Sequence, residues 1–161
     1  MIFKTRFFLI PILFIFTACN KDDDKVTESD RAEALLGQWK YEAIMSDKAI
    51  DIDGDGTVNI DLFNTQEIRQ CLKDNLTFFT EMGSESGGSY SINENGLACD
   101  DQDPFSTIEE DNYRLEDNSI IKFDNRNEMR IIQLTKSRLE IETSDNLGGE
   151  DVVVTITYKK G

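Results

Sequence analysis

The sequence predicts one mainly-β domain: an antiparallel up-and-down β-barrel of about eight strands, preceded by a short N-terminal helix. First, apolar and polar residues alternate with a period of two along most of the chain, as in half-buried antiparallel strands. Second, short turn sequences separate these runs, as in a meander. Third, the segment 31–161 is long enough to bury a single hydrophobic core.

The helix is predicted over residues 29–36. Ser29 or Asp30 supplies a capping side chain, apolar residues follow at helical spacing, and Gly37 ends the helix. The first strand starts directly after this glycine.

Eight strands account for the rest of the domain. Trp39, Tyr41 and the alternate residues up to 45 share one face of the first strand, and Val152 to Tyr158 alternate in the same way in the last. The predicted strands are 39–45, 76–81, 90–92, 113–115, 120–123, 129–134, 138–142 and 152–158. The short turns between them, such as 117–118 and 124–127, favour a closed barrel or a strongly curved sheet.

The first 18 residues have the pattern of an export signal. Lys4 and Arg6 are followed by an apolar run over 7–16, which is shorter than the roughly 20 residues that span a bilayer. Residues 16–19, Phe-Thr-Ala-Cys, resemble the lipobox of bacterial lipoproteins, which implies that Cys19 is acylated and becomes the mature N-terminus. The alternative is an ordinary signal peptide followed by an incidental cysteine.

Residues 19–30 are predicted to be a lipidated tether. They are charged and poor in large apolar groups, so they bury too little surface to order themselves. Lys21 and the acidic run 22–24 resemble a signal that directs some Bacteroidetes lipoproteins to the outer face of the outer membrane. We therefore expect a lipid anchor in the outer membrane and exposure at the cell surface, with a periplasm-facing position as the alternative.

Charge excludes one class of partner. Loss of residues 1–18 removes Lys4 and Arg6 and leaves 15 Lys and Arg against 32 Asp and Glu, a net charge of −17. Such a field repels nucleic acid and anionic lipid head groups, so we expect no nucleic-acid partner.

Two cysteines remain besides Cys19, namely Cys71 and Cys99. In an exported protein a leftover pair usually forms a disulfide, which we predict here. Zinc bound by cysteine and histidine is excluded because the chain has no histidine.

The order of these features resembles a known family. Gly37-x-Trp39 at the start of the first strand resembles lipocalins, in which this tryptophan closes the base of the barrel. The chain as a whole resembles the lipocalin-like lipoprotein domains of Bacteroidetes. The further matching features are the lipobox, the Asp-rich segment 51–61, Cys71, Cys99 before a proline, and four closing strands. The resemblance implies a lipocalin-like barrel and structural roles for Gly37 and Trp39.

A calcium site is predicted in the Asp-rich segment. Residues 51–59, Asp-Ile-Asp-Gly-Asp-Gly-Thr-Val-Asn, match the first nine positions of an EF-hand loop, and calcium requires six to eight oxygen ligands. Leu62 stands where the loop has its bidentate glutamate, so Asp61 or Glu67 would have to contribute. The candidate ligands are Asp51, Asp53, Asp55, Thr57, Asn59 and Asp61; the alternative is an acidic turn without metal. No other cofactor is predicted.

Catalysis has little support in the sequence. Without histidine there is no Ser-His-Asp or Cys-His arrangement, so we expect no enzyme.

Five aromatic residues either line a cavity or fill the core, and core filling is the more common role in small barrels. They are Trp39, Tyr41, Phe78, Phe79 and Tyr90. The first functional hypothesis is a membrane-tethered barrel that binds a small apolar or amphipathic ligand or has a structural role. The second is an accessory or adhesion module that binds glycan or protein through its loops.

Overall fold

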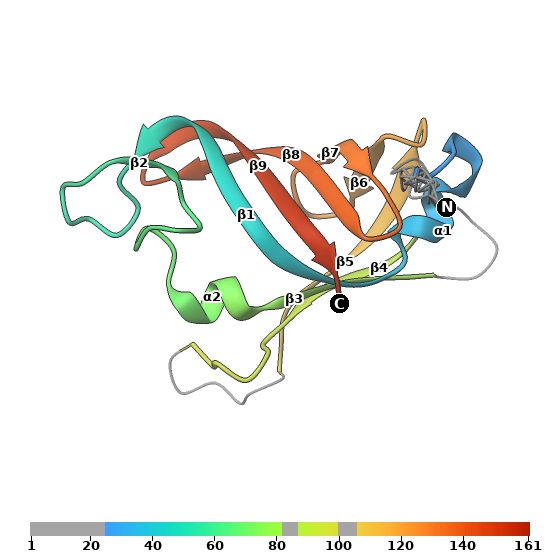
Figure 1. Ribbon diagram of the computed structural model, residues 1–161, viewed down its shortest axis with the longest axis horizontal. Helices are drawn as coiled ribbons and strands as arrows, with labels where there is room; N and C mark the ends of the chain where they lie inside the picture. Colours follow the sequence, from blue (N-terminus) through green and yellow to red (C-terminus); the bar gives the residue numbers. More distant parts are fainter. Residues whose placement is uncertain (1–24, 82–86, 100–105) are drawn as a thin grey trace, which may run out of the picture.

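The computed structural model describes residues 25–81, 87–99 and 106–161, so the signal sequence and Cys19 lie outside the described residues. Nine strands form one antiparallel sheet, and pairing of β1 with β9 closes eight of them into a barrel (Figure 1). The fold class expected from the sequence, a mainly-β antiparallel barrel with a short N-terminal helix, is confirmed. Each barrel strand is therefore paired on both sides, and the closed sheet surrounds a hydrophobic core.

The elements follow one another around the barrel in chain order. A 3-10 turn at Glu28–Asp30 leads into α1. The helices are α1 (Arg31–Leu35) and α2 (Gln70–Asp74), and the strands are β1 (Gly37–Ile50), β2 (Asn59–Asp61), β3 (Leu76–Glu81), β4 (Gly87–Asn93), β5 (Thr107–Glu116), β6 (Ile120–Phe123), β7 (Met129–Leu134), β8 (Arg138–Leu147) and β9 (Glu150–Lys160). In the described part of the chain, no helix is long and apolar enough to cross a membrane.

Strand β1 is longer than predicted and changes face along its length. Trp39 is fully buried, but a register shift against β9 lies between Tyr41 and Ala43. Beyond it Ile44 is buried, whereas Met45 is 37% exposed. The expectation that Met45 shares the inward face of Trp39 is therefore wrong, because a bulge adds one residue and exchanges the two faces.

The segment between β1 and β3 contains two elements that the sequence pattern did not predict. Strand β2 pairs with the far end of β1 through Met45 and Ile50, on the edge that β3 occupies nearer the start of β1. Helix α2 follows, although only one helix was expected. Both elements are too short to give a periodic signal, and contacts with the barrel stabilise them.

Two clusters of apolar side chains form the core. The larger one fills the barrel from α1 to its middle and includes Leu35, Trp39, Phe79 and Tyr90. The smaller one lies between the far halves of β1 and β9 and the segment that follows β2, and its buried members are Ile44, Ile50, Leu62, Val152 and Val154.

Candidate functional site

One end of the barrel is closed around Trp39. The indole is fully buried, and its Nε1 donates a hydrogen bond to the carbonyl oxygen of Leu35 at 2.8 Å. Lys160 Nζ lies 4.9 Å from the centre of the indole ring and donates to the carbonyl oxygen of Ala34 at 2.8 Å. Desolvation by burial lowers the pKa of Lys160. Gly37, at φ 117°, makes the turn from α1 into β1 in a region that favours glycine.

Towards the other end, the barrel holds a pocket of about 200 Å³ lined mainly by apolar and aromatic side chains. Residues of β1, β4, β7, β8 and β9 form its wall: Tyr41, Ile44, Tyr90, Ile92, Met129, Thr143, Asp145, Leu147, Val154, Ile156 and Tyr158. Ile68 and Leu72 line it from the segment between β1 and β3. A largely apolar pocket with few polar groups is the usual form of a small-molecule site. We call this cavity the lumen pocket.

Three tyrosines bring hydroxyl groups to this pocket, and Thr143 and the exposed Asp145 of β8 are further polar residues in its lining. The rings of Tyr41 and Tyr158 lie 4.9 Å apart. Burial raises the pKa of Tyr41, Tyr90 and Tyr158, so all three remain neutral and able to donate hydrogen bonds.

One cation also lines the lumen pocket. Arg126, from the loop between β6 and β7, lies 4.7 Å from the ring centre of Tyr90 and 5.1 Å from that of Phe123. Its Nη1 forms an ion pair with Glu109 of β5. The arginine side chain is 27% exposed and that of Glu109 41% exposed, so the carboxylate is the more solvated member of the pair.

The carboxylate of Asp111 holds the residue that precedes Arg126 in this loop. Asp111, on β5, accepts hydrogen bonds from the backbone N–H of Asn125 at 3.0 Å and from its side-chain amide at 3.1 Å. Burial raises the pKa of Asp111, but these bonds and one from the backbone N–H of Asn112 outweigh it and leave the pKa below its usual value. Asp111 therefore stays ionised and fixes the residue next to Arg126.

A disulfide holds in place the segment from which Ile68 and Leu72 line the lumen pocket. Cys71 of α2 is bonded to Cys99 in the loop after β4, with the two Cα atoms 5.3 Å apart, so the predicted pairing is confirmed. Leu72, which lines the pocket, is adjacent to Cys71 in α2. The bond thus ties one wall of the pocket to the β4–β5 side of the barrel.

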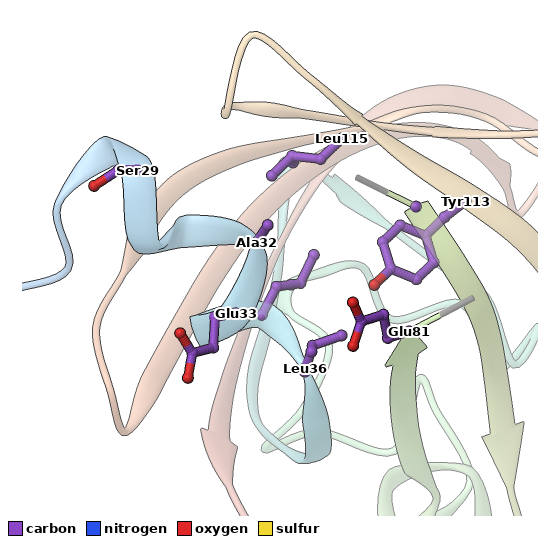
Figure 2. A pocket seen from close by; sticks show the side chains of 9 residues that line it. Ser29, Ala32, Glu33, Leu36, Glu81, Tyr113 and Leu115 are labelled. Atoms are coloured by element: carbon purple, nitrogen blue, oxygen red, sulfur yellow. The ribbon is translucent and has the colours of Figure 1, made fainter. Parts of the chain in front are cut away.

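A larger pocket of about 480 Å³ lies outside the barrel, between α1 and the ends of β3, β4 and β5 (Figure 2). Glu81 and the ring of Tyr113 line one side, and Glu33 and Leu36 come from the other. Burial, and secondarily the charge of Glu81, raise the pKa of Tyr113 to about 12. Two carboxylates and Ser29 interrupt the apolar lining of this larger pocket, so we favour the lumen pocket, whose wall is formed mainly by apolar and aromatic side chains.

The Asp-rich loop brings three of its predicted ligands together. Carboxylate oxygens of Asp51, Asp53 and Asp55 lie within 4.8 Å of one another. The two oxygens of Asp51 also accept hydrogen bonds from the backbone N–H groups of Gly54 and Gly56 at 2.7 and 2.9 Å, which folds the loop around the carboxylates. Oxygen ligands at this spacing suit calcium, which remains a prediction.

The other predicted ligands take different positions. Asn59 donates to Glu67, which is 4% exposed and also accepts the backbone N–H of Ile52. Asp61 instead accepts hydrogen bonds from Phe63 and Asn64, and those from Asn64 lower its pKa. The backbone N–H of Thr57 donates a hydrogen bond to the carboxylate of Asp55.

No local sequence pattern predicted Arg126, Glu109 or Asp111 as site residues. Arg126 stands in a predicted turn, and Glu109 lies before the strand predicted at 113–115, which in the structure begins at Thr107. Of the aromatic set, Tyr41 and Tyr90 line the pocket, Trp39 and Phe79 belong to the core, and Phe78 is half-buried on the opposite face of β3.

No protein-family model matches this chain, and no curated protein matches it. Among solved structures, it is similar to a deswapped triple mutant of bovine odorant binding protein, with 13% identity and a TM-score of 0.47, over 80% of this chain and 74% of the other. A complex of bovine odorant binding protein with a selenium-containing odorant gives 12% identity and a TM-score of 0.44, over 81% of this chain and 72% of the other.

Proposed function

We propose that this protein is a lipid-anchored binding protein of the cell envelope whose barrel takes up a small apolar or amphipathic molecule. The observation that carries the proposal is the lumen pocket, a cavity of about 200 Å³ lined mainly by apolar and aromatic side chains. Its volume corresponds to about seven water molecules at liquid density, which suits a small ligand.

The disulfide supports a binding role because it pre-organises the pocket. Ile68 and Leu72 approach the pocket from a segment with little regular structure of its own. Cys71 holds that segment in place through Cys99, so little ordering entropy remains to be lost when a ligand binds.

Anchoring is proposed from the sequence around Cys19. In this proposal the acylated Cys19 is the mature N-terminus, and the charged residues after it hold the barrel away from an outer-membrane surface. Mass spectrometry of the N-terminal peptide from the exported protein should find Cys19 with an acylglycerol mass. An unmodified N-terminus at another residue would contradict the anchor without affecting the barrel.

Native mass spectrometry of the barrel domain, residues 20–161, exported by its own host behind a signal peptide without a lipobox, tests ligand binding directly. We expect a co-purifying small molecule. Its occupancy should fall in Leu72→Trp, because the larger ring fills the mouth of the pocket. The matched control is Leu97→Trp, at a residue that is 50% exposed and lines none of the pockets described.

A domain that carries no small molecule, and that takes up no apolar probe in solution, would contradict the proposal. The accessory or adhesion role of the same barrel would then be the better explanation. Equal loss of ligand in Leu72→Trp and Leu97→Trp would place the binding site outside the lumen pocket.

A further inference from the structure

We infer that the ligand of the lumen pocket is an amphiphile with an anionic head group, such as a carboxylate, which Arg126 binds while the apolar part lies among the barrel side chains. This inference rests on the proposed function and narrows it to a class of ligand.

The first argument is the position of the charge. Arg126 lies against the faces of Tyr90 and Phe123 and lines the lumen pocket itself. Burying a cation in apolar surroundings is costly unless an opposite charge or hydrogen bonds compensate for it. A guanidinium at this place therefore requires an anionic partner.

Glu109 meets that requirement only in part. Arg126 Nη1 lies beside a Glu109 oxygen, yet this buried nitrogen has no hydrogen bond of acceptable geometry. A guanidinium has five N–H donors, so one off-axis carboxylate contact leaves capacity for a second anion. Because Glu109 is 41% exposed, it can turn towards water at small cost when a ligand takes its place.

Exposure distinguishes Arg126 from three other ion-paired arginines of the barrel. Arg114, Arg130 and Arg138 are 59%, 63% and 46% exposed, against 27% for Arg126. Those three form surface pairs that water screens, whereas Arg126 acts within a largely apolar pocket, where an ionic hydrogen bond is stronger.

The arginine is also fixed in place before any ligand arrives. Asp111 holds Asn125 through two hydrogen bonds, and the two aromatic rings hold the guanidinium. A rigid, planar set of donors is suited to a carboxylate, which it can bind through two parallel hydrogen bonds.

The same arrangement disfavours other head groups. An ammonium would meet Arg126 at close range, and the faces of Tyr90 and Phe123 that attract cations are already covered by this guanidinium. The carboxylate of Asp145 also lines the pocket, but it is exposed, so water screens its attraction for a cation. An alcohol would form hydrogen bonds without the charge, so it should bind more weakly than a carboxylate of the same chain length.

The test compares octanoate, octanol and octylammonium at neutral pH by NMR titration of the barrel domain, residues 20–161, which retains every described element. We expect octanoate to bind about tenfold or more tightly than octanol, the range for a hydrogen bond to a charged group, and octylammonium to bind most weakly. Arg126→Met should abolish the preference for octanoate, and Arg126→Lys should restore part of it. The matched control, Arg130→Met, removes an exposed arginine on the outer face of the barrel and should keep the preference.

Glu109→Gln provides a second measurement that does not depend on the folding of Arg126→Met. It removes the competing carboxylate, so octanoate should bind more tightly while octanol is unaffected. Equal affinities of octanoate and octanol in the unaltered domain would overturn the inference that the ligand has an anionic head group. A preference for octanoate that survives Arg126→Met would overturn it too. In either case the proposed binding function of the barrel would still stand. Failure of all three probes to bind would overturn the proposed function together with this inference.

Discussion

Trp39 and Leu35 are joined by a hydrogen bond from the indole Nε1 to the backbone carbonyl oxygen, 2.8 Å long and fully buried. It ties the first barrel strand to the last residue of α1 and satisfies a carbonyl group that the end of a short helix leaves free. The helix therefore acts as part of the barrel core at this end.

Replacing Trp39 should destabilise the protein strongly. Trp39→Ala removes a large buried side chain, for which the expected loss in free energy of unfolding is about 3–5 kcal/mol. Trp39→Phe keeps most of the apolar volume and should cost less, mainly through the unsatisfied Leu35 carbonyl. Urea denaturation measures both values.

The emission of Trp39, the only tryptophan in the chain, gives an independent check. A blue-shifted spectrum that acrylamide does not quench agrees with the buried position. Solvent-like emission from the folded protein would show that the closed end is not formed as described.

The disulfide between Cys71 and Cys99 should contribute to stability as well as to the pocket. Replacing both cysteines with serine frees a long loop in the unfolded chain, and the chain-entropy model gives a loss of about 3–4 kcal/mol. Denaturant unfolding of the double variant measures the loss, and non-reducing peptide mapping should recover the two peptides joined. An unchanged midpoint would mean that α2 is held by its packing alone.

Asp111 should make stability depend on pH in the acid range. Its pKa is lowered in the folded state, so its contribution is fully present above the unfolded value of about 3.9 and is lost as the pH falls through the folded value. Asp111→Asn should lower the melting temperature at pH 7 and reduce the further drop between pH 5 and pH 3. Calorimetry across this range measures both effects.

The neighbouring substitution Glu110→Gln, on the exposed face of β5, is the matched control and should keep the unaltered pH profile. If Asp111→Asn retained the full acid-induced drop, other carboxylates would account for it.

Calcium should raise the melting temperature if the Asp-rich loop binds it. A ligand that binds only the folded state stabilises it by mass action, by about 2.7 kcal/mol at a hundredfold excess over its dissociation constant. We expect a higher melting temperature in millimolar calcium, reversal by EDTA, and loss of the shift in Asp53→Ala. Asp145→Asn, at an exposed aspartate outside the loop, should respond as the unaltered protein does. The same melting temperature in calcium and in EDTA would favour a metal-free acidic turn.

The periodic parts of the fold could be predicted from the sequence, and the departures from periodicity could not. Alternation and turn residues placed the barrel strands, and the even number of remaining cysteines predicted the disulfide. The bulge after Tyr41 was missed because a single extra residue leaves no mark on composition, although it exchanges the faces of Ile44 and Met45. Arg126 was missed because its position depends on the contact between Asp111 and Asn125, which are 14 residues apart, and no local pattern encodes this contact.

Strand β1 also has a consequence for how the protein unfolds. It contributes Trp39 to the larger core cluster and Ile44 to the smaller one, while Tyr41 and Ile156 pack against both. Neither cluster can lose its packing without removing a wall of the other, so the barrel and the segment that carries the Asp-rich loop form one cooperative unit. A perturbation at the loop is therefore transmitted to the global unfolding equilibrium instead of being absorbed by local fraying.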